Sequence, residues 1–213
     1  MLAVCTASAA DLSRYREFEL GTSVAAVTAV TLTAERDTKT VHIRPALLQE
    51  VVWQPRYTTG APVADRKSID EIVFSFVDDR LFKITVEYER GRTTGLTNAD
   101  MIAALTELYG VPASTSVSPR GAADAVDAAA AIAEWRQADV QMALRRTKYN
   151  ESFSLVITSL SLNAIAHKAL ATALVMDARE APAREAALAK KRADELRQAD
   201  EQTRTTNKKV FQP

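Results

Sequence analysis

The chain has 213 residues, of which 47% are hydrophobic and 25% charged, values close to the averages of soluble globular proteins. Lysine and arginine together number 27, and so do aspartate and glutamate, which leaves a formal net charge of zero. This balance removes the overall positive field used by general nucleic-acid binders, so we expect no nucleic-acid partner. The length favours a single hydrophobic core.

The first ten residues resemble the end of a secretory signal peptide. Apolar Leu2 to Cys5 precede Ala7-Ser-Ala9, an A-x-A type cleavage site, and the mature chain would start near Asp11. We therefore predict an exported protein, periplasmic or secreted. The segment Leu2-Ala-Val-Cys5 is also similar to the box at which bacterial lipoproteins are lipidated, so a lipid anchor at Cys5 is the alternative. Cys5 is the only cysteine, and a mature chain without it would hold neither a disulfide nor a thiolate metal site.

The next hundred residues begin with a helix and two strands. Ser23 is a helix-capping residue type and is followed by spaced valines, which predicts a short helix over residues 22–31. Thr40–Arg44 and Leu48–Trp53 are β-rich runs on either side of Pro45, which belongs at a bend or an edge because it lacks an amide donor. We expect them to form two strands or one broken strand. Residues 56–68 are expected to form a loop.

A β-hairpin is the clearest local prediction. Residues 72–76 and 82–88 each alternate apolar side chains with other residues, and Asp78-Asp79-Arg80 forms a tight turn between them. The polar positions of the second strand indicate that one face of this sheet meets water. Asp78 and Asp79 are adjacent acids at a hairpin tip, where we expect them to point into solvent as turn residues rather than act as a catalytic pair.

A second helix and a second hairpin follow. Thr97 and Asp100 predict a capping box at the start of a helix that ends at Gly110, and residues 114–131 are expected to form a loose connection. Residues 140–144 and 153–157 again alternate and are expected to extend the same sheet. No segment reaches the roughly 18 to 20 apolar residues of a membrane span.

The C-terminal region changes to Ala, Lys, Arg, Glu and Asp, which predicts a helix over about residues 162–205 with a kink or break near Pro182. The fold class is therefore α+β, an antiparallel sheet of about five to six strands backed by helices, with a long charged C-terminal helix. We divide the chain into a signal remnant (1–10), an α+β domain (11–178) and a helical tail (179–213).

Little in the sequence indicates chemistry. His42 lies in a strand and His167 in a helix, far apart, and each is expected to be structural. With these two histidines and no mature cysteine, we expect no metal site, and with six glycines we expect no nucleotide-cradling loop and no cofactor. We expect no catalytic residues, which points away from an enzyme without excluding one.

A ligand cleft is the second hypothesis. Arg90, Arg92 and the amides of the Gly91–Thr97 loop before a helix could hold a phosphate or carboxylate. Trp53 and Trp135 with Tyr57 could line a groove, and Arg44 is a further candidate around such a cleft. The alternative for each of these residues is an ordinary structural role in a cap or in the core.

One short motif resembles a known group. Phe18-x-x-Gly21-Thr22-Ser23-x-x-x-Val27 resembles the opening motif of the BamE and β-lactamase-inhibitor-protein-like group of exported bacterial domains, with a similar helix-then-hairpin order over roughly residues 15–110. Because that group consists largely of binding and assembly proteins, the resemblance implies a binding role. The insertion at Val41–Trp53 and the charged C-terminal helix depart from the group, so no partner carries over. More broadly, the chain is similar to uncharacterised exported bacterial proteins.

Three functions remain open from the sequence. The first is a non-enzymatic, exported interaction module that contacts another envelope protein through its C-terminal helix. The second is a small-ligand binder or enzyme with a cleft near Arg44, Trp53 and Arg92. The third is a structural subunit that self-associates through the helix, and the sequence leaves the oligomeric state undetermined.

Overall fold

The computed structural model describes residues 11–55, 57, 68–115, 130–147 and 152–210. The predicted signal segment, with Cys5, lies outside these residues. The chain divides into two compact units, Met1–Ala169 and Leu170–Pro213. The charged helical tail predicted from the sequence, residues 179–213, lies within the second of these units.

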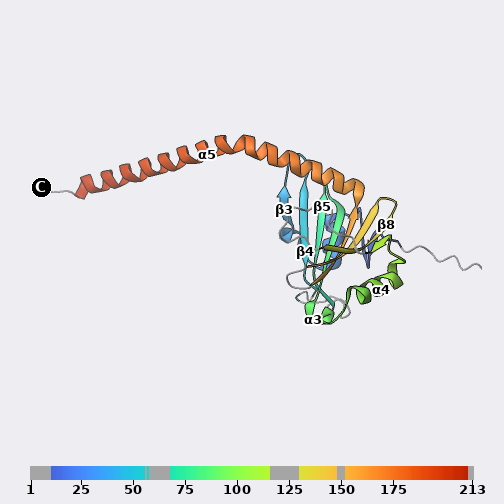
Figure 1. Cartoon of the computed structure of the whole chain (residues 1–213). Coiled ribbons are helices and arrows are strands. Elements are labelled where there is room, and N and C mark those ends of the chain that lie inside the picture. Colours follow the sequence, from blue (N-terminus) through green and yellow to red (C-terminus); the bar gives the residue numbers. More distant parts are fainter. Residues whose placement is uncertain (1–10, 56, 58–67, 116–129, 148–151, 211–213) are drawn as a thin grey trace, which may run out of the picture. The chain divides into compact units, whose positions relative to one another are not determined.

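The first unit is built on one antiparallel sheet (Figure 1). The order of the eight strands that the structure describes in it is β3-β4-β5-β6-β10-β9-β8-β7. Their bounds are Lys39–His42 (β3), Leu48–Trp53 (β4), Ile69–Val77 (β5), Arg80–Tyr88 (β6), Phe153–Ser159 (β10), Val140–Arg146 (β9), Ala130–Gln137 (β8) and Ser114–Thr115 (β7). Every neighbouring pair is antiparallel, as predicted.

The sheet is larger than the predicted five to six strands. The four strands expected from alternating side chains and the two β-rich runs are all present as strands, and β7 and β8 are additional. Strand β8 begins in an alanine-rich run, and alanine has low β propensity, so the sequence hides this strand inside the expected loose connection. Strand β7 has two residues, which is too short to show any alternation.

The β5–β6 hairpin has the predicted two-aspartate turn. Asp78 and Asp79 have φ values of 47° and 59°, the left-handed region that suits a type I′ turn. Their carboxylates do not simply point into solvent as expected. Oδ1 of Asp78 accepts a hydrogen bond from the amide of Leu47 (3.0 Å), and Oδ1 of Asp79 accepts one from the amide of Val24 (2.8 Å). The hairpin tip therefore holds two neighbouring segments, because each carboxylate accepts a hydrogen bond from a backbone amide of one of them.

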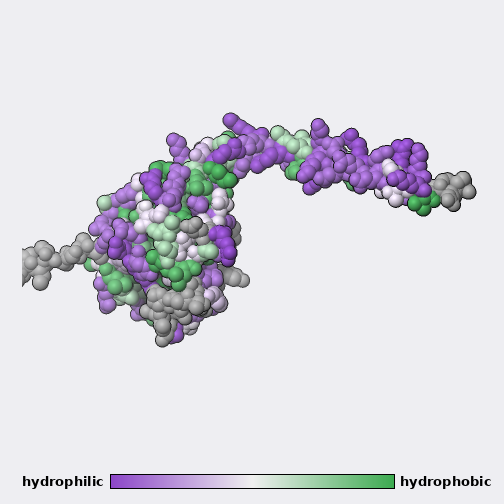
Figure 2. Space-filling view, turned by 180° about the vertical axis from the view of Figure 1, so that it is seen from behind, coloured by the Kyte–Doolittle hydropathy of each residue, from purple (hydrophilic) through white to green (hydrophobic). Residues whose placement is uncertain are grey.

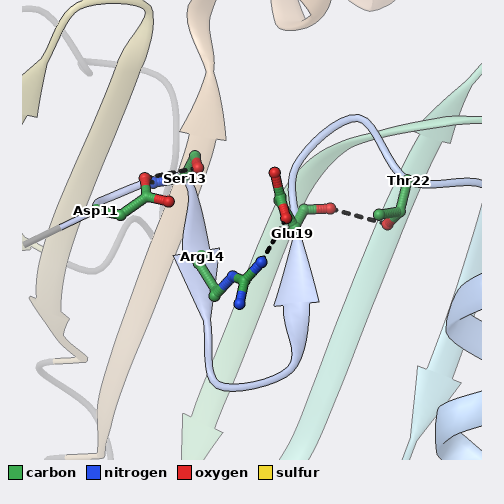
Figure 3. A network of polar contacts seen from close by, with 5 residues as sticks. All are labelled: Asp11, Ser13, Arg14, Glu19 and Thr22. Atoms are coloured by element: carbon green, nitrogen blue, oxygen red, sulfur yellow. Dashed lines mark hydrogen bonds and ion pairs between the residues drawn. The ribbon is translucent and has the colours of Figure 1, made fainter.

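The N-terminal segment forms a small hairpin of its own, β1 (Arg14–Tyr15) with β2 (Phe18–Glu19). Figure 3 shows its polar contacts: Arg14 pairs with the Glu19 carboxylate at 2.7 Å, and the Thr22 hydroxyl donates to the Glu19 carbonyl at 2.8 Å. The Asp11 carboxylate accepts hydrogen bonds from the hydroxyl and amide of Ser13, which lower the pKa of Asp11. These contacts order the chain from residue 11 onward.

Helix α1 (Val24–Thr31) follows, with Ser23 as its N-cap, as predicted, and the short 3-10 helix η1 spans Glu35–Asp37. The Phe18–Val27 motif has a structural role here. Phe18 is buried against Trp53 (ring centroids 5.7 Å apart) and Phe74 (4.6 Å), and Gly21 has φ 91°, which only glycine adopts readily. The motif thus joins the hairpin to the helix.

Two helices follow β6, namely α3 (Arg90–Thr93) and α4 (Asn98–Tyr109). The predicted capping box of α4 is present: the Thr97 hydroxyl accepts from the Asp100 amide, and the Asp100 carboxylate accepts from the Thr97 amide at 2.8 Å. The helix ends at Gly110, as expected. The indole of Trp135 in β8 donates to the Gly110 carbonyl at 2.7 Å and so ties this helix end to the sheet.

The main core lies on one face of the sheet. It joins the inward side chains of β4, β5, β6, β8, β9 and β10 to those of the N-terminal hairpin, α1 and α4. Its largest fully buried members include Phe18, Phe74, Phe153 and Trp135. The alternation of the two predicted hairpins identified most of this face, because inward and outward side chains alternate along each strand.

The opposite face is partly covered. The sequence predicted that this face of the β5–β6 hairpin meets water, and its polar residues Lys83, Thr85 and Glu87 are half-buried. Leu48, Val77 and Phe82 are buried but lie outside the main core. The first turns of helix α5 (Leu160–Val210) contribute Ala166 and Ala169, both buried, and Asn163 and His167, which share a pocket with strand residues of this face. The start of α5 therefore lies over the second face of the sheet.

The second unit consists of helix α5 from Leu170 onward, and its described side chains are mostly exposed. The sequence predicted a kink or a break near Pro182, and of these two the break is absent, because α5 continues through the proline. One turn before the proline, the carbonyl of Asp177 accepts a hydrogen bond from Arg184 at 3.1 Å. The carbonyl that loses its backbone donor at Pro182 is that of Ala178, four residues before the proline.

Candidate functional site

A polar pocket of about 490 Å³ lies between the second face of the sheet and the first turns of α5. Its size is within the range of small-molecule sites, which span roughly 300–1,000 Å³. Strands β6, β10 and β9 supply its floor, and α5 supplies Asn163 and His167. The charged groups that line it are Lys83, Glu87 and Arg145, His167 contributes an imidazole, and the hydroxyl groups are those of Thr85, Thr147, Ser154 and Thr158.

Strand register places these side chains in rows across the floor. Glu87 of β6 is opposite Ser154 of β10, which is opposite Arg145 of β9. Side chains directly opposite on one face of an antiparallel pair lie about 5 Å apart at Cβ, so a carboxylate, a hydroxyl and a guanidinium follow one another across three strands. A second row begins at Lys83, which is opposite Thr158.

Glu87 belongs to the first row, and its surroundings disfavour the charged form of its carboxyl group. Its partial burial raises the pKa of this carboxyl group, and the negative charge of Glu71, directly opposite on β5, raises it further. A carboxylate in this position favours an adjacent positive charge or a proton. Lys83, Arg145 and His167 line the same pocket, so cationic and neutral hydrogen-bond donors outnumber its single carboxylate.

The α5 wall of the pocket is fixed at its start by Asp139, in the turn between β8 and β9. Its carboxylate accepts hydrogen bonds from the Ser161 hydroxyl (2.6 Å), the Ser159 hydroxyl (2.8 Å) and the Ser161 amide (2.9 Å). These bonds, led by the Ser161 hydroxyl, lower the pKa of Asp139. A carboxylate at a helix N-terminus also interacts favourably with the helix dipole, so Asp139 helps to position Asn163 and His167 over the floor.

A second pocket, of about 620 Å³, contains two of the residues that the sequence suggested. Trp53 and Tyr57 line it together with Arg36 and Asp37 of η1. Trp53 is only 2% exposed and is also part of the main core, whereas Tyr57 is 77% exposed. The structure thus brings Trp53 and Tyr57 together in one depression on the surface.

The three arginines of the cleft hypothesis lie elsewhere. Arg44 is exposed in the turn before β4, whereas Trp53 is the last residue of β4, a strand that spans about 17 Å from Leu48 to Trp53 at 3.3 Å per residue. Arg90 and Arg92 are exposed on α3, which follows β6, and neither lines the Trp53 pocket. The structure therefore does not gather all five residues into one site.

The amides proposed to hold an anion beside Arg90 and Arg92 already have partners. The Glu89 carboxylate accepts from the Gly91 amide at 3.1 Å, and the Asp100 carboxylate accepts from the Thr97 amide. The chain's own carboxylates occupy the positions that an external anion would need.

The helix of the second unit presents an apolar seam, which we define as Leu174, Leu188, Leu196 and Val210. These side chains are 58%, 53%, 67% and 75% exposed, respectively. At about 100° per residue, all four point within roughly 40° of one direction around the helix. Figure 2 shows that the rest of this helix is mostly hydrophilic, with apolar side chains in places.

Residues 13–169 match the family model of the TP0088 domain. The chain belongs to the TP0088 domain family. The matched segment ends at Ala169, which is also the last residue of the first compact unit, so the domain of the family and this unit coincide at that end. The match does not confirm the resemblance to the BamE and β-lactamase-inhibitor-protein-like group. Neither the curated proteins nor the solved structures give a significant match to the chain.

Two absences hold for the described part of the TP0088 protein. Among those residues, no group of three or more His, Cys, Asp or Glu side chains lies close enough together to hold a metal ion. No helix in the same residues combines the length and the apolar character that crossing a membrane requires.

Sequence reasoning missed the polar pocket of the TP0088 domain. The sequence alone indicates a solvent-facing side of a strand for Lys83, Thr85 and Glu87, and a structural role in a helix for His167. The pairing of β6 with β10, about 70 residues later, is what assembles the floor. The available signal was Ala166 and Ala169, small residues at helical spacing that allow α5 to approach a sheet closely.

Proposed function

We propose that this TP0088-domain protein is a non-catalytic interaction protein of the bacterial cell envelope that binds another protein through residues 170–210 of α5. The observation that carries the proposal is the apolar seam, because four large apolar side chains that share one direction are each more than half exposed. Such a face contributes nothing to an isolated helix in water and is the feature by which amphipathic helices bind partners.

The composition of this helix supports the proposal independently. Opposite charges at i, i+3 and i, i+4, such as Lys191 with Glu195 and Arg197 with Asp194, stabilise the helix without a core. The helix can therefore be formed before it meets a partner, which lowers the ordering cost of binding. The N-terminal pattern at Leu2–Ala9 supports the envelope location, with a lipid anchor at Cys5 as the alternative route to the same compartment.

Capture from an envelope extract tests the proposal. The full chain would be compared with the double variant Leu188→Glu/Leu196→Glu, which places two charges in the seam. Ala183→Glu adds a charge on the opposite side of the helix and is the matched control. We expect the control to retain the captured protein and the seam variant to lose it. Identical capture by all three chains would refute a role for the seam.

The polar pocket supports a second candidate function, the binding of a small polar ligand. Lys83, Arg145 and the hydroxyl groups of the pocket are mostly hydrogen-bond donors, so the chemistry favours a ligand rich in acceptors, such as a small carboxylate. A panel of small carboxylates would be screened by the shift in thermal unfolding temperature. Arg145→Ala should abolish any shift, whereas Arg136→Ala, outside the pocket, should not. A shift that survives Arg145→Ala and Lys83→Ala would exclude this site.

A further inference from the structure

We infer that the partner of the apolar seam is the same seam on a second copy of this chain, with the two helices antiparallel and centred on Arg192. The inference rests on the proposed function, since it names the protein that the helix binds. The positions of the seam side chains and the charges that flank them both support it.

The seam is symmetric about Arg192. In an antiparallel pair, a residue a given number of positions before the centre lies beside the residue the same number of positions after the centre on the other copy. Leu188 and Leu196 lie four residues on either side of Arg192, and Leu174 and Val210 lie eighteen residues on either side. Every large apolar residue of the seam therefore meets another one.

The positions between these residues fit the same arrangement. Residues of the same helix face recur at spacings of 4, 3, 4, 3 and 4 outward from Arg192 in both directions, which is the alternation of coiled-coil core positions. Two adjacent spacings of four at Arg192 make a local stutter, which such seams tolerate. Ala178 then meets Thr206 and Ala181 meets Thr203, and these small side chains let the helices approach closely.

The flanking charges are complementary in this arrangement. On one side of the seam, Lys191 lies beside Glu195 of the second copy, and Asp177 lies beside Lys209 of the second copy. Two-fold symmetry repeats each pair, which gives four attractive pairs. Within one copy the Lys191 Nζ and Glu195 Oε1 atoms are 3.9 Å apart and both side chains are well exposed, so they are placed to contact a second helix. Charges at such positions set the partner and the direction of paired helices.

A parallel pair would be less favourable. It would place Glu185 against Glu185 and Arg192 against Arg192 in the seam, so two layers would bring like charges together. In the antiparallel pair Glu185 meets Ala199, and only Arg192 meets its own copy. A long arginine side chain can direct its charge out of the seam into water while its stem covers apolar surface. Charge therefore selects the antiparallel direction.

Sedimentation equilibrium of the full chain tests the association. We expect an average mass that rises with concentration from one chain toward two. Leu188→Glu/Leu196→Glu should lower the association constant by about 100-fold or more, because each buried leucine is worth roughly tenfold or more. Ala183→Glu, on the far side of the helix, should leave the association constant unchanged. Circular dichroism would verify that all three chains retain the same helix content.

Disulfide trapping tests the direction of the helices. In a Cys5→Ser background, a tagged Leu188→Cys chain would be mixed with an untagged Leu196→Cys chain and oxidised. In the antiparallel pair, residues 188 of the two copies are about 12 Å apart along the axis, too far for a disulfide, whereas residues 188 and 196 are adjacent. Mixed dimers are therefore expected. Dimers of each chain with itself would overturn the antiparallel arrangement.

The outcomes separate this inference from the proposed function. A chain that stays monomeric at all concentrations overturns self-association. If that monomer still captures a different envelope protein through the seam, the proposed function stands and only the identity of the partner changes. If the chain neither self-associates nor captures an envelope protein, both this inference and the proposed function are overturned.

Discussion

The turn aspartate Asp79 offers the most direct test of how the TP0088 domain is held together. Its carboxylate accepts the amide of Val24, the first residue of α1, at 2.8 Å, and its own backbone is left-handed with φ 59°. Asp79→Ala removes the hydrogen-bond acceptor and places alanine in the left-handed region. That region costs a residue with a Cβ atom about 1–2 kcal/mol, and aspartate already bears part of this cost. Because Asp79 is exposed, we take about 1 kcal/mol for each effect and expect a total near 2 kcal/mol.

Three variants separate the two effects. Asp79→Gly removes the hydrogen bond but suits the left-handed backbone, so it should cost about 1 kcal/mol. Asp79→Asn keeps an acceptor and tolerates the backbone, so it should cost less than about 0.5 kcal/mol. Urea unfolding would be followed by tryptophan fluorescence, because both tryptophans, Trp53 and Trp135, are buried in the first unit. A free energy of unfolding of Asp79→Ala that lies within about 0.5 kcal/mol of that of the unaltered chain would refute the reasoning.

Three further predictions concern the same unit. Thr97→Ala should lower the free energy of unfolding by about 1 kcal/mol, because it removes the cap of α4. Asp100→Ala should cost less in the Thr97→Ala background than alone, because the two side chains form one capping box. Additive losses of the free energy of unfolding in urea would contradict this coupling. Trp135→Phe should cost about 1–2 kcal/mol because it leaves the Gly110 carbonyl without its indole donor, measured through the fluorescence of the remaining tryptophan. Burial raises the pKa of Tyr15 to about 12, above its ordinary value of 10. The contribution of the protonated Tyr15 to the free energy of unfolding is therefore complete below pH 10 and is lost as the pH rises toward 12, by about 2–3 kcal/mol in all. In a titration followed by phenolate absorbance, Tyr15→Phe should remove a group that ionises late, and an unchanged titration curve would contradict the assignment.

Local signals predicted much of the fold. Ser23, the Thr97–Asp100 box and Gly110 identified the ends of helices, and alternating side chains identified the four strands of the two hairpins, because caps and pleats depend on residues that are close in sequence. The extra strand β8 was hidden because its alanines do not favour a strand on their own. It is stabilised by its partner β9 and by the buried Trp135, which are tertiary effects.

The candidate sites were harder to predict for the same reason. The polar pocket needs the pairing of β6 with β10 and the return of α5 over the sheet, and neither is encoded in a short motif. Trp53 and Tyr57 share a pocket as their proximity in sequence suggested, but Arg44 lies at the other end of β4. The symmetry of the seam about Arg192, by contrast, can be read from the sequence once helix α5 is known to be continuous through Pro182.

The two edges of the sheet carry a consequence for how copies of this protein could meet. Within residues 11–115 and 130–210, as far as the structure describes them, the order of strands ends at β3, which has four residues and a register shift at Thr40–His42, and at β7, which has two residues. Long, flat edges invite another chain to add a strand, and short or bulged edges discourage it. The sheet of one copy is thus poorly suited to continue into the sheet of another, which protects the domain from open-ended fibre growth. Pairing of helix α5 with α5 of one second copy, in contrast, would form a closed dimer to which no further chain is added.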